Sequence, residues 1–132
     1  MNSALSRYLD LCYAMRMTNV RAEPTRPMID RERVQAADFL QAADTFAVLA
    51  SPVRVRLLWL LSEQAGDVGH LADQVGVSLA TASHHLGRMR LAGLVSARSE
   101  GRRQLYSLDD PHVLSLVTEA VDHHADLRIR SR

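Results

Sequence analysis

Residues 71–108 read LADQVGVSLATASHHLGRMRLAGLVSARSEGRRQLYSL, and this segment alone predicts the fold. Apolar residues recur at helical spacing on both sides of the pair Gly76-Val77, so we expect two helices joined by a tight turn. Ser78 is placed to cap the second helix, which we expect to end near Ala92. Two helices joined by a short turn that contains glycine form a helix-turn-helix, whose second helix enters the major groove of DNA.

Beyond Gly93 the spacing of apolar residues changes from that of a helix to that of a strand. The segments 94–98 and 104–108 are short strand-like runs, and the residues between them, 99–102, include Gly101. This arrangement predicts a β-hairpin with glycine at its tip. The expected fold is therefore mainly α with a small β-hairpin wing, a winged helix-turn-helix.

Two further helices are expected before this segment. Helical spacing begins at Asp30 and continues to about Ala50. Ser51-Pro52 then provides an N-cap and a proline at the first helical position, and the helix that follows fades near Glu63.

The polar residues of these helices indicate where the helices end and which of their faces are exposed to solvent. We expect Arg54 and Arg56 to face solvent, and Asp67 to begin the helix that precedes the Gly76-Val77 turn. Asp110 is placed to cap a last amphipathic helix, Val113–Leu127.

The chain is organised around one domain. Residues 1–30 contain Pro24 and Pro27, which interrupt any continuous helix, so we interpret them as an N-terminal arm that is mobile or, alternatively, contacts DNA or adds a ligand through Cys12. Residues 31–127 form the winged helix-turn-helix domain, and residues 128–132 are assigned to a C-terminal tail.

Composition excludes several classes of protein. A chain of 132 residues fits one globular domain, and its single cysteine rules out a disulfide framework and a zinc site built on paired cysteines. The sequence has no run of 18 or more apolar residues, which would predict a membrane span. A secretory signal is not expected either, because Arg7, Asp10 and Arg16 interrupt the N-terminal segment. We therefore expect a cytoplasmic protein with no membrane partner. No glycine-rich phosphate loop, H-E-x-x-H sequence or nucleophile with a paired base is present, so we expect no enzyme.

Charge is distributed unevenly although the formal net charge is only +1. All 16 basic residues are arginine, which favours forked contacts with phosphate and guanine. Residues 78–108 contain five arginines and one glutamate, whereas residues 109–126 contain five acidic residues and no arginine. A basic segment followed by an acidic, histidine-bearing segment indicates two different binding functions.

Candidate DNA-contacting residues lie in the second helix of the helix-turn-helix and at the tip of the wing. Recognition helices read base edges from their N-terminal half and hold phosphates with basic groups near by. Each residue alone could be only a helix cap or a solvated side chain, but together with the helix-turn-helix spacing they predict binding to double-stranded operator DNA. The candidates are Ser78, Thr81, Ser83, His84, Arg88, Arg102 and Arg103.

The order of several short sequences resembles the ArsR/SmtB family of small winged-helix repressors. They are Leu49-Ala50-Ser51-Pro52-Val53-Arg54, Leu71-Ala72, Ser83-His84-His85-Leu86, Ala92-Gly93-Leu94-Val95, Gly101-Arg102 and Tyr106-Ser107-Leu108. The resemblance covers roughly residues 35–127. It implies a homodimer held together by the first and last helices, which binds an imperfect inverted repeat in a promoter.

The last helix carries a pattern of metal-binding residue types, Asp110, His112, His123 and Asp126. Nitrogen and oxygen donors suit Zn²⁺, and four of them match its tetrahedral preference. The eleven residues from His112 to His123 turn about 1100°, so both histidines project from nearly the same side, but they also span about 16 Å. One helix cannot close such a site, whereas two antiparallel helices related by a two-fold axis can, with two equivalent sites per dimer.

Without the resemblance, the simpler interpretation would be that these histidines are solvated and that Asp110 only caps the helix. Zinc sensors of the ArsR/SmtB family use this pattern between their last helices, so the resemblance implies a metal site, with Zn(II) preferred and Co(II) or Ni(II) as alternatives. Sensors of softer ions carry a cysteine pair where Asp67 and Gly69 stand here, and the arm offers no histidine for octahedral nickel. His124 lies about 100° off the stripe and is not assigned as a ligand.

The resemblance also implies a mechanism. The apo homodimer represses a gene of metal efflux or metal handling, and bound metal favours a dimer shape that no longer fits the operator. In the family a ligand histidine reaches the backbone near the end of the recognition helix, which would join His123 to the region of Gly93. The alternative is a regulator of the same fold that responds to no metal or to a different signal. A metal-dependent hydrolase is disfavoured, because four protein ligands leave zinc no open position for water.

Overall fold

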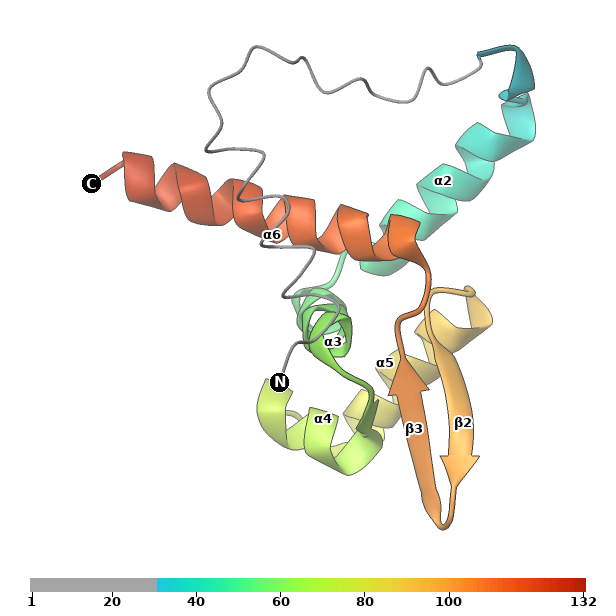
Figure 1. Ribbon diagram of the computed structural model, residues 1–132, viewed down its shortest axis with the longest axis vertical. Helices are drawn as coiled ribbons and strands as arrows, with labels where there is room; N and C mark the ends of the chain where they lie inside the picture. Colours follow the sequence, from blue (N-terminus) through green and yellow to red (C-terminus); the bar gives the residue numbers. More distant parts are fainter. Residues whose placement is uncertain (1–30) are drawn as a thin grey trace. The chain divides into compact units, whose positions relative to one another are not determined.

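The computed structural model describes residues 31–132 (Figure 1). The described elements are the 3₁₀ turn η1 (Arg31–Arg33), α2 (Ala36–Leu49), α3 (Pro52–Glu63), β1 (Gly66–Asp67), α4 (Val68–Val75), α5 (Leu79–Leu91), β2 (Ser96–Glu100), β3 (Arg103–Ser107) and α6 (Pro111–Arg130). The chain divides into two compact units, of which the first ends at Phe46 and the second is Ala47–Arg132. The predicted arm, residues 1–30, lies outside the described residues.

In the first unit, the helix that was expected from Asp30 begins only at Ala36. The backbone N–H of Gln35 donates to the Asp38 carboxylate at 2.8 Å, and this bond satisfies one of the donors that a helix start leaves open. None of the α2 side chains is buried, and the large apolar residues Phe39, Leu40 and Phe46 are exposed.

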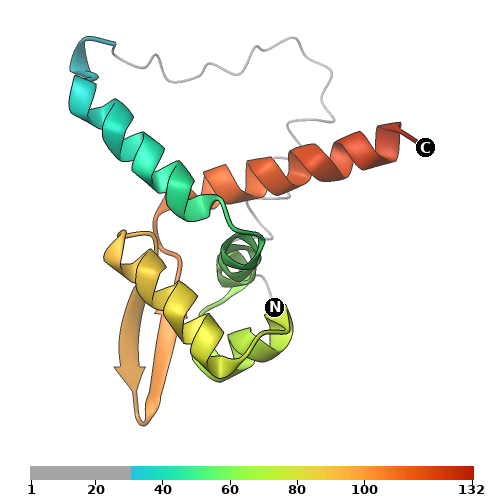
Figure 2. The same cartoon turned by 180° about the vertical axis from the view of Figure 1, so that it is seen from behind.

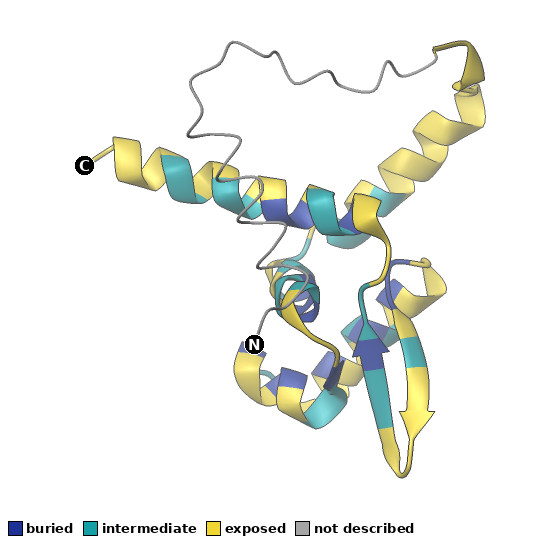
Figure 3. Ribbon diagram, viewed as in Figure 1, coloured by how far each residue is buried: buried dark blue, intermediate teal, exposed yellow. Residues whose placement is uncertain are grey.

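The second unit has α3 at its centre, with α4, α5 and α6 packed around it and the sheet to one side (Figures 1 and 2). The dark blue residues of Figure 3 mark a core where α3, α4 and α5 meet the sheet and the first half of α6. The members of this core are Leu57, Leu58, Leu61, Leu71, Val75, Leu86, Met89, Leu94, Val95, Tyr106, Val113 and Val117. Each helix turns its apolar stripe inward, as the spacing of these residues predicts.

The wing is confirmed and includes a strand that was not predicted. β2 and β3 form an antiparallel hairpin with Glu100 opposite Arg103, so the connecting loop is shorter than the expected residues 99–102. Gly101 has φ of 63°, a left-handed conformation that glycine adopts without strain. β1 pairs with the other side of β3, with Gly66 opposite Tyr106, which completes a three-stranded sheet in the order β1-β3-β2.

Two further predictions need correction. α6 continues to Arg130, so residues 128–130, which were assigned to a tail, are helical. Arg54 was expected to face solvent but is only 8% exposed, and its Nε donates to the carbonyl of Val48 near the end of α2. Arg56 is exposed as expected, and its guanidinium also donates to the carbonyls of Gln74 at 3.0 Å and Val75 at 3.4 Å.

Taken singly, no helix of residues 31–132 is long and apolar enough to cross a membrane, and by length and composition alone only the broken pair α2–α3 passes that test.

Candidate functional site

The predicted recognition helix is α5. Ser78 caps it as expected: its hydroxyl accepts the backbone N–H of Thr81 at 3.1 Å and lies 2.9 Å from the Thr81 hydroxyl. The buried side chains of α5 are Ala82, Leu86 and Met89. The five predicted DNA-contacting residues of this helix are all exposed, namely Ser78, Thr81, Ser83, His84 and Arg88. Figure 2 shows α5, in yellow, on the near side of the second unit and beside the hairpin. The helix therefore presents an exposed and largely polar surface that can approach a DNA groove.

The turn before α5 fixes the orientation of this helix. Gly76 has φ of 76° and ends α4, and its N–H donates to the Ala72 carbonyl at 2.9 Å. Gly76 adopts this left-handed C-cap because it has no Cβ to clash. The last carbonyls of α4, at Gln74 and Val75, accept from Arg56 of α3. The central helix α3 thus binds the end of α4 and fixes the position of the helix-turn-helix.

The two predicted DNA-contacting arginines of the wing differ in their surroundings. Arg102 is exposed in the hairpin loop. Arg103 forms an ion pair with Asp67, although its side chain is still 64% exposed. Asp67 also caps α4, since its carboxylate accepts the backbone N–H of His70 at 2.8 Å. These two interactions, the backbone bond first, lower the pKa of Asp67. Asp67 therefore connects the wing to the helix-turn-helix.

The predicted metal-binding helix begins as the sequence indicates. Asp110 caps α6, and its Oδ1 accepts the backbone N–H of His112 at 2.8 Å, with Pro111 in the first turn. A carboxylate has two oxygens and about four acceptor positions, so this cap leaves Asp110 with the capacity to bind a cation as well. His112 and His123 are exposed, and Asp126 is half-buried.

Within a single chain these residues do not come together. Among residues 31–132, no three histidine, cysteine, aspartate or glutamate side chains lie close enough to hold a metal ion. Both pairs lie on the one continuous helix α6, so the separation of about 16 Å between His112 and His123 that the sequence predicts still applies. The donor chemistry fits a zinc-type ion, and the spacing requires a second copy of the helix.

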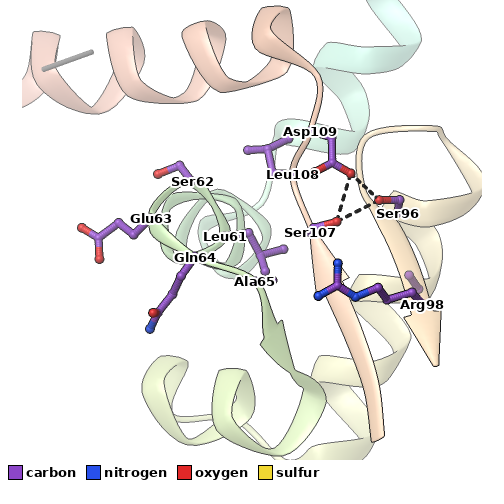
Figure 4. A pocket seen from close by; sticks show the side chains of 11 residues that line it. Leu61, Ser62, Glu63, Gln64, Ala65, Ser96, Arg98, Ser107, Leu108 and Asp109 are labelled. Atoms are coloured by element: carbon purple, nitrogen blue, oxygen red, sulfur yellow. Dashed lines mark hydrogen bonds between the residues drawn. The ribbon is translucent and has the colours of Figure 1, made fainter. Parts of the chain in front are cut away.

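The junction between the wing and α6 holds a polar cluster that was not predicted (Figure 4). Asp109 Oδ2 accepts the hydroxyl of Ser96 at 2.6 Å and the hydroxyl of Ser107 at 3.0 Å. These two hydrogen bonds, the Ser96 bond first, lower the pKa of Asp109. The cluster lies at the edge of an open pocket of about 430 Å³ between the end of α3 and the two strands of the hairpin, and Arg98 also lines this pocket.

Comparison with known proteins identifies the family. Residues 49–97 match the model of a helix-turn-helix domain. The solved structure of the homodimeric winged helix-turn-helix DNA-binding domain of Mb0332 from Mycobacterium bovis, a possible ArsR-family transcriptional regulator, is 36% identical, covers 74% of this chain and 86% of that one, and has a TM-score of 0.61. The transcriptional regulator NmtR of Mycobacterium tuberculosis is 35% identical over 109 residues, which are 83% of this chain and 86% of the relative. The chain belongs to the ArsR/SmtB family.

Membership of the ArsR/SmtB family explains the winged helix-turn-helix and agrees with the expectation that the chain is no enzyme, because the relatives are DNA-binding transcriptional regulators. Another relative, the transcriptional regulator KmtR of Mycobacterium tuberculosis, is 40% identical over 78 residues, which are 59% of this chain and only 60% of that protein. The resemblance to this relative therefore covers less than two thirds of its length. The individual DNA-contacting and metal-binding residues of this ArsR/SmtB chain stay predictions.

Proposed function

We propose that the protein is a metal-responsive repressor that binds operator DNA as an apo homodimer and is released when it binds Zn(II) or Co(II). Its targets would be genes of metal efflux or homeostasis, and it would act in the cytoplasm. One observation carries this proposal: Asp110 and His112 lie in the first turn of α6, and His123 and Asp126 lie near its other end, on one continuous helix. Four nitrogen and oxygen donors are thus divided into two pairs that only a second chain can join.

A homodimer is supported by the apolar surface that one chain leaves open. α6 exposes Leu116, Leu127 and Ile129, and α2 exposes Phe39, Leu40 and Phe46. Large apolar side chains left exposed on a helix are candidates for a protein interface. If two copies of α6 pack antiparallel, Asp110 and His112 of one chain meet His123 and Asp126 of the other, and two equivalent metal sites form.

DNA binding is supported by the exposed polar face of α5 and by the wing. Ser83 and His84 provide hydrogen-bonding groups for base edges, and Arg88 and Arg102 provide cations for phosphates. Metal can release this DNA only if it binds the DNA-incompetent dimer more tightly, and DNA must then weaken metal binding by the same factor. One route for this coupling is the link that the family resemblance implies, from His123 to the backbone near Gly93.

The test compares two neighbouring histidines. The probe is double-stranded DNA selected by the apo protein from a random-sequence pool, and its dissociation constant is measured by fluorescence anisotropy with and without Zn²⁺. We expect His123→Ala to bind the DNA like the wild type but to resist release by Zn²⁺. The matched control His124→Ala, one position off the stripe, should be released normally. Normal release of His123→Ala would remove this residue from the site.

Metal stoichiometry and geometry complete the test. Titration with Co²⁺ should saturate at two ions per dimer and give the intense visible absorption of tetrahedral cobalt, whereas octahedral coordination would indicate a nickel-type site. A wild-type protein that binds selected DNA but takes up no Zn²⁺, Co²⁺ or Ni²⁺ in equilibrium dialysis would favour the second candidate function, a regulator of the same fold that responds to a different signal.

A further inference from the structure

The junction between the wing and α6 is held by three side chains that converge on one point (Figure 4). Ser96, the first residue of β2, is directly opposite Ser107, the last residue of β3. Their hydroxyl oxygens lie 2.9 Å apart, and both hydroxyls lie within hydrogen-bonding distance of the same oxygen, Oδ2 of Asp109. The two hydroxyls have only two hydrogens for these three contacts, and bonds to the carboxylate are the stronger ones because they are charge-assisted.

This cluster adds a connection that the backbone alone does not provide. The chain passes from β3 to α6 through Leu108, Asp109 and Asp110, so covalent bonds join only β3 to the helix. The bond from Ser96 to Asp109 joins β2 as well, and thus both strands of the hairpin end at the same carboxylate. The base of the wing is therefore attached at two points to the residue before the helix cap.

The next residue along the chain is part of the predicted metal site. Asp110 caps α6 by accepting the backbone N–H of His112, and both residues are predicted ligands. Asp109 and Asp110 share a peptide group, which is planar and stiff. A movement of Asp110 and His112 toward a partner helix therefore has a covalent path of one peptide group to Asp109, and through its carboxylate to the two serine hydroxyls.

We propose that the cluster Ser96–Ser107–Asp109 is a positioning device that transmits the binding of a divalent cation at the start of α6 to the wing. This inference rests on the proposed function and adds a second route to it, separate from the recognition helix. The wing carries Arg102 and Arg103, so a rotation of the hairpin about its base alters how these cations meet the DNA backbone. Part of the coupling between metal and DNA then depends on three side chains that touch neither ligand.

Four variants test the device. Asp109→Ala and the double variant Ser96→Ala/Ser107→Ala break the cluster from its two sides. Asp109→Asn keeps an oxygen that accepts hydrogen bonds and should restore the coupling. Ser99→Ala is the matched control, because its hydroxyl donates across the same hairpin to Gln104 at 3.2 Å but does not reach Asp109. A thermal melt of each apo variant establishes that it is folded.

The first measurement is the ratio of the dissociation constants for the selected DNA with and without saturating Zn²⁺. Typical coupling between two sites corresponds to a factor of about 5–150. We expect Asp109→Ala and the double serine variant to reduce the wild-type ratio about fivefold or more, whereas Asp109→Asn and Ser99→Ala keep it within about twofold. Zn²⁺ affinity in the absence of DNA should change little in all four variants, since none of the substituted residues is a predicted ligand.

The second measurement needs no DNA. Amide hydrogen exchange of residues 96–107 reports how the wing responds to metal. In the wild type we expect Zn²⁺ to change this exchange, and in Asp109→Ala and the double serine variant we expect that change to be lost. A wild-type ratio and a wild-type exchange response in both of these variants would overturn the inference and leave the proposed function intact. A wild type that neither binds Zn²⁺ nor releases DNA would overturn both.

Discussion

The guanidinium of Arg54, in α3, lies 3.2 Å from Nδ1 of His85, in the predicted recognition helix α5. Arg54 is buried and also donates to the carbonyl of Val48. Since arginine only donates hydrogen bonds, Nδ1 of His85 must accept, and the ring is then neutral with its proton on Nε2. One buried cation thus joins the end of α2, the central helix and the predicted recognition helix.

This contact predicts a dependence of stability on pH. Burial first, and then the nearby guanidinium of Arg54 and the side chains of His84 and Arg88, lower the pKa of His85 below its usual value of 6.5. The unfolded chain therefore takes up a proton at a higher pH than the folded one. The stabilisation that neutral His85 provides is complete above about pH 6.5, declines as the pH falls below this value, and levels off below the folded pKa.

The variant His85→Asn tests this dependence, because asparagine can accept from Arg54 without titrating. The free energy of unfolding is measured by urea titration between pH 7.5 and pH 5 with a chelator present. We expect the wild type to lose more stability than His85→Asn over this range, and the exposed neighbour variant His84→Asn to behave like the wild type in this respect. Parallel curves for wild type and His85→Asn would contradict the prediction.

The ion pair between Asp67 and Arg103 predicts that one residue restrains the DNA affinity of the wing. In Asp67→Asn the cap of α4 is kept, since asparagine is as good an N-cap as aspartate, but Arg103 loses its anionic partner. Arg103 is then available to a phosphate. We expect equal or tighter binding to the selected DNA and a steeper salt dependence, by up to about one unit in the slope of log K against log salt. Weaker binding with an unchanged slope would show that the pair is needed to place the wing.

Arg102, at the tip of the wing, is predicted to contact phosphate. The ion pairs of the wing, Arg98 with Glu100 and Arg103 with Asp67, do not involve Arg102. The variant Arg102→Ala should weaken binding to all DNA sequences alike and make the salt slope shallower by about one. Arg128→Ala, an exposed arginine at the far end of α6, is the matched control and should keep the slope. A slope that Arg102→Ala leaves unchanged would remove this residue from the interface.

Two leucines of α5 provide a test of the core. Leu86 is completely buried and Leu91 is 92% exposed. Leu86→Ala should reduce the free energy of unfolding by about 2–5 kcal/mol, because it removes buried methyl groups and leaves a cavity. Leu91→Ala should change this free energy by less than about 0.5 kcal/mol. Both values come from chemical denaturation followed by circular dichroism, and similar losses in the two variants would contradict the assignment of the buried face.

The sequence predicts best the features that depend on a few neighbouring residues. Four helix starts are capped as expected, because the capping bond joins residues only two or three positions apart, and these caps are Ser51, Asp67, Ser78 and Asp110. The hairpin is predicted for the same reason, as its alternation and its glycine are local.

The features that were missed depend on contacts between distant segments. β1 is only two residues long and exists because β3 passes beside it. Arg54 was assigned to solvent because helical periodicity alone says nothing about partners such as Val48 and His85, which other helices bring to it. The cluster on Asp109 likewise needs a pairing across the hairpin. The pattern of metal-binding residue types on α6 can be recognised in the sequence. A complete metal site requires a second chain, so this site stays a prediction.

The cap of α6 has a consequence for the stability of the folded chain under the proposed function. Asp110 begins this helix with one carboxylate oxygen, so the chain's own hydrogen bond holds the helix start. Many small zinc domains unfold when a chelator removes their metal, because their ions also hold the chain together. Here an ion that binds the other carboxylate oxygen of Asp110 is not needed to hold the start of α6, so its release leaves the helix folded. Under the proposed function, one protein molecule therefore binds and releases metal repeatedly without unfolding.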